Sequence, residues 1–243
     1  KIAVTQEEYD RIKRNLVYYQ SKWDDVQYKN TDGDIQSRPM NHLPIARTAS
    51  KKIASLVYNE QATITTKNEI LQKFLDEMLT NDRFNKNFER YLESCLALGG
   101  LAMRPYIDGD KVRVAFIQAP VFLPLQSNTQ DVSSAAILTK TIQSEGKTNV
   151  YYTLVEFHEW VTKDGSEIGS TKDKSLYRIT NELYKSNTDN SLGQRVNLQE
   201  LYPDLEPVTV LKDLSRPLFT YLKTPGMNNK DINSPLGLSI FDN

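Results

Sequence analysis

The chain has 243 residues, of which 39% are hydrophobic and 25% are charged, as is ordinary for a soluble globular protein. Lys and Arg total 30 against 31 Asp and Glu, so the formal net charge is -1, which excludes a broad basic surface for gripping duplex DNA. Cys95 is the single cysteine, which excludes an intrachain disulfide and a zinc site built from several thiolates. No signal segment and no long apolar run is present, so we expect no membrane span.

The first 100 residues have the apolar periodicity of helices. Thr5 and Glu8 have the spacing of a capping box, which predicts a helix over residues 5–19. Pro44 predicts the first turn of a second helix, and two further helices follow. The apolar positions are Ile45, Ala49, Ile53, Leu56 and Val57 in the second helix, Ile70, Leu71, Phe74, Leu75, Met78 and Leu79 in the third, and Phe84, Phe88, Tyr91, Leu92 and Cys95 in the fourth. Gly99-Gly100 predicts the end of the fourth helix, and because these glycines follow a helix they do not resemble a phosphate loop.

Two short stretches interrupt the predicted helices. Residues 21–38 are polar and carry only a turn signal at Asp32-Gly33. Residues 62–65, Ala-Thr-Ile-Thr, are rich in β-branched side chains and predict a short strand.

After Gly100 the apolar period becomes that of strands. Asp108-Gly109-Asp110 predicts a hairpin between residues 101–107 and 112–118, and Glu145-Gly146-Lys147 predicts a second hairpin between residues 137–143 and 150–160. Further strands are predicted over residues 176–184 and 219–222. Because helices precede strands instead of alternating with them, we expect an α+β fold with mainly antiparallel strands. The expected organisation is a mainly helical part over residues 1–100 and a strand-rich part over residues 101–243.

One pair of side chains suggests hydrolytic chemistry. Glu156 and His158 lie two residues apart on a predicted strand, so they face the same side, where a carboxylate can orient an imidazole as a general base. Tyr152, Leu154 and Trp160 share that face, and a pair without a third partner is of low specificity. A structural role is therefore the favoured interpretation.

Cys95 is the second candidate for catalysis, since a cysteine and a histidine suffice for nucleophilic chemistry. It lies on the apolar stripe of the fourth helix between Leu92 and Leu96, where cysteine is usually buried. His42 precedes Pro44 at a loop-to-helix junction, where a solvated or capping histidine is expected. The sequence therefore predicts no catalytic, metal-binding or cofactor-binding residue.

Two groups of charged residues have simple explanations. Asp24-Asp25 and Asp32-x-Asp34 are expected to be solvated turn residues, because the bidentate Glu of a calcium loop is missing from the required position. Basic and acidic side chains alternate on the fourth helix, which favours an exposed, salt-bridged helix face over a phosphate contact. The basic residues are Arg83, Lys86 and Arg90, and the acidic ones are Glu89 and Glu93.

Several segments, in this order, resemble the portal proteins of tailed phages of Gram-positive bacteria, in the minor-capsid-type branch of that family. They include a helix that ends in Asn59-Glu60 and a helix that stops at Gly99-Gly100 before a strand. The segments are residues 46–60, 92–106, 119–124, 151–158, 177–184, 219–229 and 234–241.

The resemblance implies a structural, non-enzymatic subunit of a dodecameric ring at one capsid vertex, through which double-stranded DNA passes during packaging and ejection. It implies terminase, major capsid or scaffolding proteins and head-completion proteins as partners, with assembly in the host bacterial cytoplasm and a final place in the virion. The chain is expected to be mainly the wing, without the stem, clip and crown, so DNA is contacted mainly outside it. No cofactor is implied.

Two alternatives stay open at this point. One is another phage interaction module, such as a head-completion or tail-adaptor protein, and the other is a hydrolase that uses Glu156 and His158 or Cys95. We expect the isolated chain to be monomeric or weakly associated, because a ring interface without stem and crown leaves little surplus over the entropic cost of association.

Overall fold

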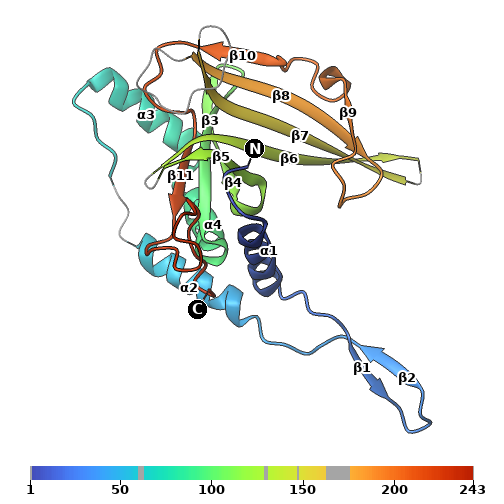
Figure 1. The fold of residues 1–243 in the computed structure, drawn as a ribbon. Helices are drawn as coiled ribbons and strands as arrows, with labels where there is room; N and C mark the ends of the chain where they lie inside the picture. Colours follow the sequence, from blue (N-terminus) through green and yellow to red (C-terminus); the bar gives the residue numbers. More distant parts are fainter. Residues whose placement is uncertain (1, 60–62, 129–130, 147, 163–175, 243) are drawn as a thin grey trace.

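The computed structural model describes residues 2–59, 63–128, 131–146, 148–162 and 176–242. Helices come first along the chain and strands dominate the rest (Figure 1), so the predicted α+β fold class is confirmed. The helices are α1 (Gln6–Gln20), α2 (Ile45–Tyr58), α3 (Glu69–Asn81) and α4 (Phe84–Leu98), with short 3-10 turns η1 (Ala119–Val121) and η2 (Leu198–Glu200). The strands are β1 (Val26–Lys29), β2 (Ile35–Arg38), β3 (Gly100–Asp108), β4 (Lys111–Gln118), β5 (Phe122–Ser127), β6 (Val132–Glu145), β7 (Thr148–Val161), β8 (Leu176–Ser186), β9 (Gln194–Val196), β10 (Val208–Leu211) and β11 (Thr220–Lys223).

The strands form three sheets in which every described pair is antiparallel. The largest sheet has the order β10-β8-β7-β6-β5, with β9 added beside β8. A second sheet has the order β11-β3-β4, and β1 and β2 pair only with each other. The predicted hairpins at Gly109 and Gly146 are both present, and each glycine has a positive φ, of 64° and 66°, that suits a tight turn. Lys147 of the second predicted turn lies outside the described residues.

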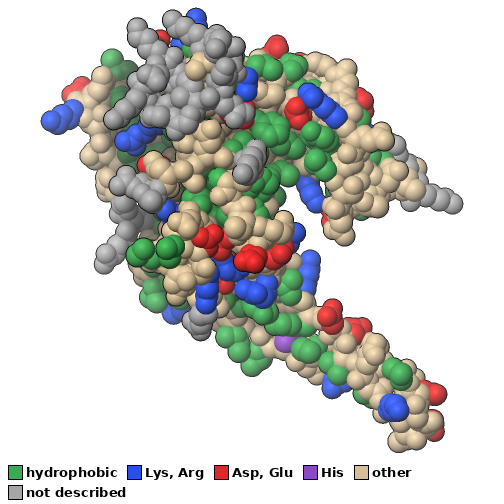
Figure 2. Space-filling model, viewed as in Figure 1, with side chains coloured by type: hydrophobic (Ala, Val, Ile, Leu, Met, Phe, Trp, Pro, Cys, Tyr) green, Lys and Arg blue, Asp and Glu red, His purple; other side chains and the backbone are tan. Residues whose placement is uncertain are grey.

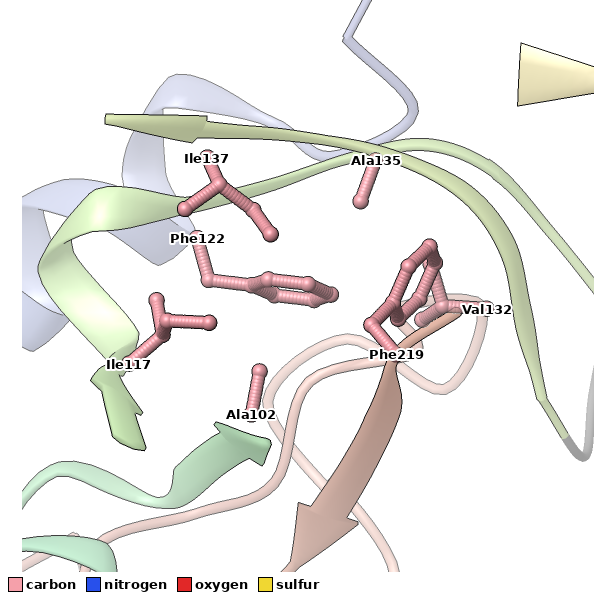
Figure 3. Close-up of a cluster of buried hydrophobic side chains, with 7 residues drawn as sticks. All are labelled: Ala102, Ile117, Phe122, Val132, Ala135, Ile137 and Phe219. Atoms are coloured by element: carbon pink, nitrogen blue, oxygen red, sulfur yellow. The ribbon is translucent and has the colours of Figure 1, made fainter. Parts of the chain in front are cut away.

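The core lies where the two larger sheets meet (Figure 3). Phe122 of β5 is fully buried there and stacks on Tyr221 of β11, with 4.9 Å between ring centroids. The ring of Phe219 contacts that of Phe122 edge-on, with 5.5 Å between ring centroids. The rest of this cluster comes from β3, β4 and β6 and consists of Ala102, Ile117, Val132, Ala135 and Ile137. Burial of these side chains from both sheets holds the two sheets face to face.

The helices pack on one another and on the smaller sheet. Helix α4 is the central one, because Leu92 and residues 94–98 in its last two turns are buried. On one side it meets α2 through Ala54, and on another it meets α1 through Ile12. Leu236, far along the chain, is buried in the same cluster as Ile12. The helical segment is therefore built into one core with residues from the end of the chain.

The hairpin of β1 and β2 projects away from the body (Figure 1), and we call residues 22–44 the arm. The expectation of an irregular stretch here was wrong, although the turn at Asp32-Gly33 is present. The side-chain oxygen of Asn30 accepts the N–H groups of Asp32 and Asp34 and so closes the turn. Because neither face of this ribbon is buried against the chain's own core, its strands lack the apolar alternation by which strands are usually recognised.

Three local predictions were wrong for physical reasons. Thr5 is the N-cap of α1 but makes no side-chain cap hydrogen bond, and the carboxylate of Glu8 bonds to Arg11 and Asn228, so the predicted capping box is not formed. Pro44 is the N-cap of α2 and not a residue of its first turn. Residues 63–65 form no strand in the structure, because no neighbouring strand pairs with them, and Ala62 lies outside the described residues.

Candidate functional site

His158 is fully buried on the inner face of β7, where it contacts aromatic rings. Its Nδ1 lies 2.9 Å from the hydroxyl of Tyr177, and its ring meets Phe219 edge-on at 5.8 Å. The Tyr177 oxygen accepts the Leu218 N–H, so its own proton is available to Nδ1, which favours the tautomer protonated at Nε2. Nε2 is buried and has no hydrogen-bond partner in the described part of the chain. Burial, aided by the nearby charge of Arg104, lowers the pKa of His158 to about 3.

Glu156 lies on the same face of β7, but its partner is not the histidine. Its carboxylate pairs with the guanidinium of Arg104 on β3 at 3.2 Å. Burial raises the pKa of Glu156, and the positive charge of Arg104 opposes that shift. The expected shared face is therefore present, whereas no contact of Glu156 orients the imidazole of His158. An uncharged imidazole with a pKa of about 3 is also a weak base, so this arrangement does not support the hydrolytic alternative.

Cys95 lies in a different cluster, on α4. Its side chain is buried among Ala54, Leu92, Leu96 and Leu101, and its Sγ lies 3.9 Å from the carbonyl oxygen of Leu222. Burial raises the pKa of this thiol to about 12, so it is protonated at neutral pH. The structure therefore gives Cys95 the surroundings of a core residue.

The remaining charged candidates lie on the surface. His42 is exposed, with its Nδ1 3.0 Å from the carbonyl oxygen of Met40. The aspartates expected in turns are exposed on the arm. The predicted basic face of α4 is exposed, but its predicted salt bridges are absent, since within the described ranges none of its three cations forms an ion pair. The glutamate on that helix that is paired, Glu93, bonds instead to Arg47 of α2 and Tyr19 of α1.

Neither a metal site nor a membrane helix emerges from the described residues. Among them, no group of three or more His, Cys, Asp or Glu side chains gathers where it could hold a metal ion. Over the same residues, no helix is long and apolar enough to cross a membrane.

A polar joint that the sequence analysis missed connects α1 with the end of the described chain. Arg11 is buried between two carboxylates, Glu8 at 3.0 Å and Asp242, with which it forms a short hydrogen bond. Asp242 also accepts hydrogen bonds from Asn15 at 3.0 Å, and Glu8 accepts one from Asn228 at 2.8 Å. We call this group the α1 joint. No spacing signal predicts it, because its two halves are more than 200 residues apart in the sequence.

A second missed contact brings two glycines together. Gly99 ends α4 with a φ of 89°, as its sequence position predicts. A Cβ atom on Gly99 would lie 2.4 Å from the carbonyl oxygen of Gly237, and one on Gly237 would lie 2.2 Å from that of Gly99. The two backbones can therefore approach only because neither residue has a side chain.

An apolar cavity of about 520 Å³ opens between α2, α4 and β11, and we call it the α2–α4 pocket. Its walls include Val57 of α2, Phe84 and Phe88 of α4 and Leu222 of β11. Lys223 contributes a cation to the same lining. Val57 in this wall and its neighbour Leu56 on α2 are both more than half exposed. Pockets of this size with mainly apolar walls are typical binding sites.

The molecule is an α+β protein in which the charged side chains that are buried join one element to another, and apolar surface is left exposed on α2 and α3. Residues 1–241 match the model of the family described as phage portal protein, SPP1 Gp6-like. Since the match spans nearly the whole chain, the chain belongs to this phage portal protein family. No curated protein shows significant similarity to it. Membership implies a structural component of the phage particle that assembles into an oligomeric ring in the capsid.

Proposed function

We propose that this chain is the wing of a portal subunit in a dodecameric ring at one capsid vertex. Double-stranded DNA passes through that ring during packaging and ejection. The family match over residues 1–241 is the observation that carries this proposal. The branch found in phages of Gram-positive bacteria is the proposed origin, on the sequence resemblance described above.

The helical part, residues 1–100, and the strand-rich part, residues 101–243, are proposed to act as one module. Helix α4 runs directly into β3 through Gly99, and the α1 joint ties the first helix to Asp242. In this proposal the stem, clip and crown are supplied by parts of the protein outside this chain.

The charge of the chain supports a position away from the DNA path. A formal net charge of -1 gives little attraction for phosphate, whereas proteins that hold duplex DNA neutralise many phosphates with Lys and Arg. DNA is therefore contacted mainly by residues outside this chain. The proposed protein partners are terminase, major capsid or scaffolding proteins and head-completion proteins, met in the host bacterial cytoplasm during assembly.

We also propose that the chain has no catalytic activity. Its titratable candidates are separated, since His158 bonds to Tyr177, Glu156 to Arg104, and Cys95 packs in the helical core. A hydrolase needs such groups to share an accessible pocket.

The test is electron microscopy and mass photometry of the full-length product at near-physiological salt. We expect closed rings with about twelve-fold symmetry and a central channel. A complete protein that remains a monomer even with its scaffolding protein present would contradict the portal proposal. That outcome would favour the head-completion or tail-adaptor alternative, which uses the same kind of structural module.

A further inference from the structure

The arm is held to its own chain at its base, where the ring of Trp23 lies 5.4 Å from that of Tyr18 on α1. Its two strands pair with each other alone, over the register from Val26 opposite Arg38 to Lys29 opposite Ile35. A single two-stranded hairpin is at best marginally stable in water, so an arm of this kind requires a surface to lie on. Figure 2 shows it projecting from the body with hydrophobic, acidic and basic side chains along its length.

The arm offers apolar contact on both of its faces. Because side chains alternate along a strand, Tyr28 lies on one face of the ribbon and Ile35, next to the turn, lies on the other. Their exposed fractions are 46% and 68%. Apolar residues on both faces are expected of a segment that is enclosed by a partner. A ribbon that lies on a surface needs apolar residues on only one face.

The size of the arm suits a specific interface. Every residue from 22 to 44 is exposed except Val26 and Asn30, which are half-buried. A standard protein interface takes about 20 to 30 residues from each partner, so the arm provides nearly one full side of such an interface by itself. Between Ser21 and the turn at Gly33 the chain can extend by at most about 40 Å, enough to reach well across a neighbouring subunit.

A receiving surface exists on another side of the same chain. The elements that line the α2–α4 pocket, α2, α4 and β11, lie toward the left of Figure 1, whereas the arm points to the lower right. Its rim continues onto exposed apolar residues of α2, Leu56 and Val57. A protrusion on one side and a cavity on the other are the two different patches of a heterologous contact, the kind of contact from which a cyclic ring is built.

The charges of the two surfaces are complementary. The turn of the arm exposes Asp32 and Asp34, and neither forms an ion pair within the described residues. Lys223 in the pocket lining and Lys52 on α2 are exposed and equally without an ion pair in that part of the chain. Opposite charges at the edge of an apolar contact set its orientation and speed its formation.

We propose that the arm of one subunit docks on a second copy of this chain, with Ile35 over the α2–α4 pocket and the acidic turn beside Lys223. This contact rests on the proposed function, because it assumes that the chain is a subunit of a ring. It assigns to the arm the role of a clasp between neighbouring subunits.

The experiment is disulfide crosslinking of the full-length protein in a Cys95→Ala background. Subunits carrying Ile35→Cys are mixed with subunits carrying Val57→Cys under assembly conditions and mild oxidation. We expect a covalent dimer in the mixture and none from either variant alone. The matched control pairs Ile35→Cys with Ile142→Cys, an exposed residue of β6 that is 60% accessible and outside the pocket, and should give no dimer.

Three results overturn the clasp. They are a mixture without crosslinks, an equally strong crosslink in the Ile142 control, or a dimer formed by Ile35→Cys alone, which would mean that arms pair with arms. Asp32→Asn with Asp34→Asn supplies an independent readout. This variant should weaken ring formation by about threefold at low salt and by less at high salt, and unchanged assembly at low salt contradicts the proposal.

Replacement of residues 24–40 by a Gly-Ser linker separates the two proposals. If the wild-type protein forms rings and the linker variant forms them equally well, the clasp is wrong and the portal function stands. If the wild-type protein forms no rings under any assembly condition, the portal function fails and the clasp fails with it. Loss of rings in the linker variant alone, with its circular dichroism spectrum and thermal stability retained, is the result that we expect.

Discussion

Arg104 of β3 and Glu156 of β7 form an ion pair that joins the two larger sheets, with 3.2 Å between Arg104 Nη2 and Glu156 Oε2. The Glu156 side chain is 9% exposed and that of Arg104 is 21% exposed. A charge pair in such a place contributes little net stability, yet it is costly to break on one side, because the remaining charge is left buried without a partner.

Replacing Arg104 alone should therefore be much more harmful than replacing the pair. We expect Arg104→Met to lower the free energy of unfolding by about 3 kcal/mol, and Arg104→Met with Glu156→Leu to recover most of that loss. Urea unfolding followed by circular dichroism measures both variants. Equal stability of the single and double variants would show that the ion pair does not couple the sheets.

The acid sensitivity of the fold should depend on His158. Its pKa is about 3 in the folded chain, against about 6.5 for an unperturbed imidazole, so between these values the unfolded chain binds a proton that the folded chain does not. The contribution of neutral His158 to the free energy of unfolding is therefore fully present above pH 6.5. It is lost as the pH falls, by about 2 kcal/mol at pH 5. His158→Gln should remove this part of the pH dependence, whatever its effect at pH 7.5.

The measurement is urea unfolding at pH 7.5 and pH 5 of the wild type and two variants. His42→Gln is the matched control, because His42 is exposed and should leave the pH dependence unchanged. If His158→Gln loses as much stability between the two pH values as the wild type, the burial of a neutral imidazole is not responsible.

The close approach of Gly99 and Gly237 predicts an unusual sensitivity to a methyl group. Gly99→Ala combines a left-handed backbone with a Cβ placed 2.4 Å from a carbonyl oxygen, so we expect it to cost about 3 kcal/mol. Gly109→Ala has a similar backbone, with a φ of 64°, but nothing within 4 Å of the new Cβ, so it should cost about 1 kcal/mol. Thermal unfolding of the two variants compares them directly, and similar losses would refute the steric explanation.

Cys95 should react only slowly with thiol reagents in the folded chain. Its thiol has a pKa of about 12 and is only 2% exposed, whereas thiol reagents attack the exposed thiolate. We expect labelling by an aromatic disulfide at pH 8 to be slower in the native protein by at least about a hundredfold than in 6 M urea, because it must await local opening. Rapid native labelling would show that the α2–α4 pocket admits reagents to the sulfur.

The sequence predicted well those elements whose signals are local. The helices begin and end within a few residues of their expected positions, because apolar residues at helical spacing and a glycine after Leu98 act over short distances. The same is true of the hairpins at Gly109 and Gly146. The strand pair β1 and β2 escaped prediction because neither of its faces is buried against the chain's own core, so its strands lack apolar alternation.

The site-level contacts were not predictable, since each depends on residues far apart in the sequence. The spacing of Thr5 and Glu8 predicts a capping box, but Arg11, Asn228 and Ser234 are the partners of the Glu8 carboxylate. Glu156 was paired with His158 because they are neighbours on one face, while the actual partner, Arg104, comes from another sheet. Alternation along a strand indicates which residues share a face, and only the packing of sheets decides what they meet.

The α1 joint determines when, during synthesis, a subunit can complete its fold and associate with its neighbours. During synthesis, Arg11 emerges early, and the carboxylate of Asp242 emerges more than 200 residues later. Until then Arg11 lacks the second of its two carboxylate partners, and helix α1 lacks the Leu236 side chain that covers Ile12. Such long-range closure makes native contacts slow to form. A nascent chain therefore cannot present a finished surface to its neighbours, which delays association until the ends of this unit have met.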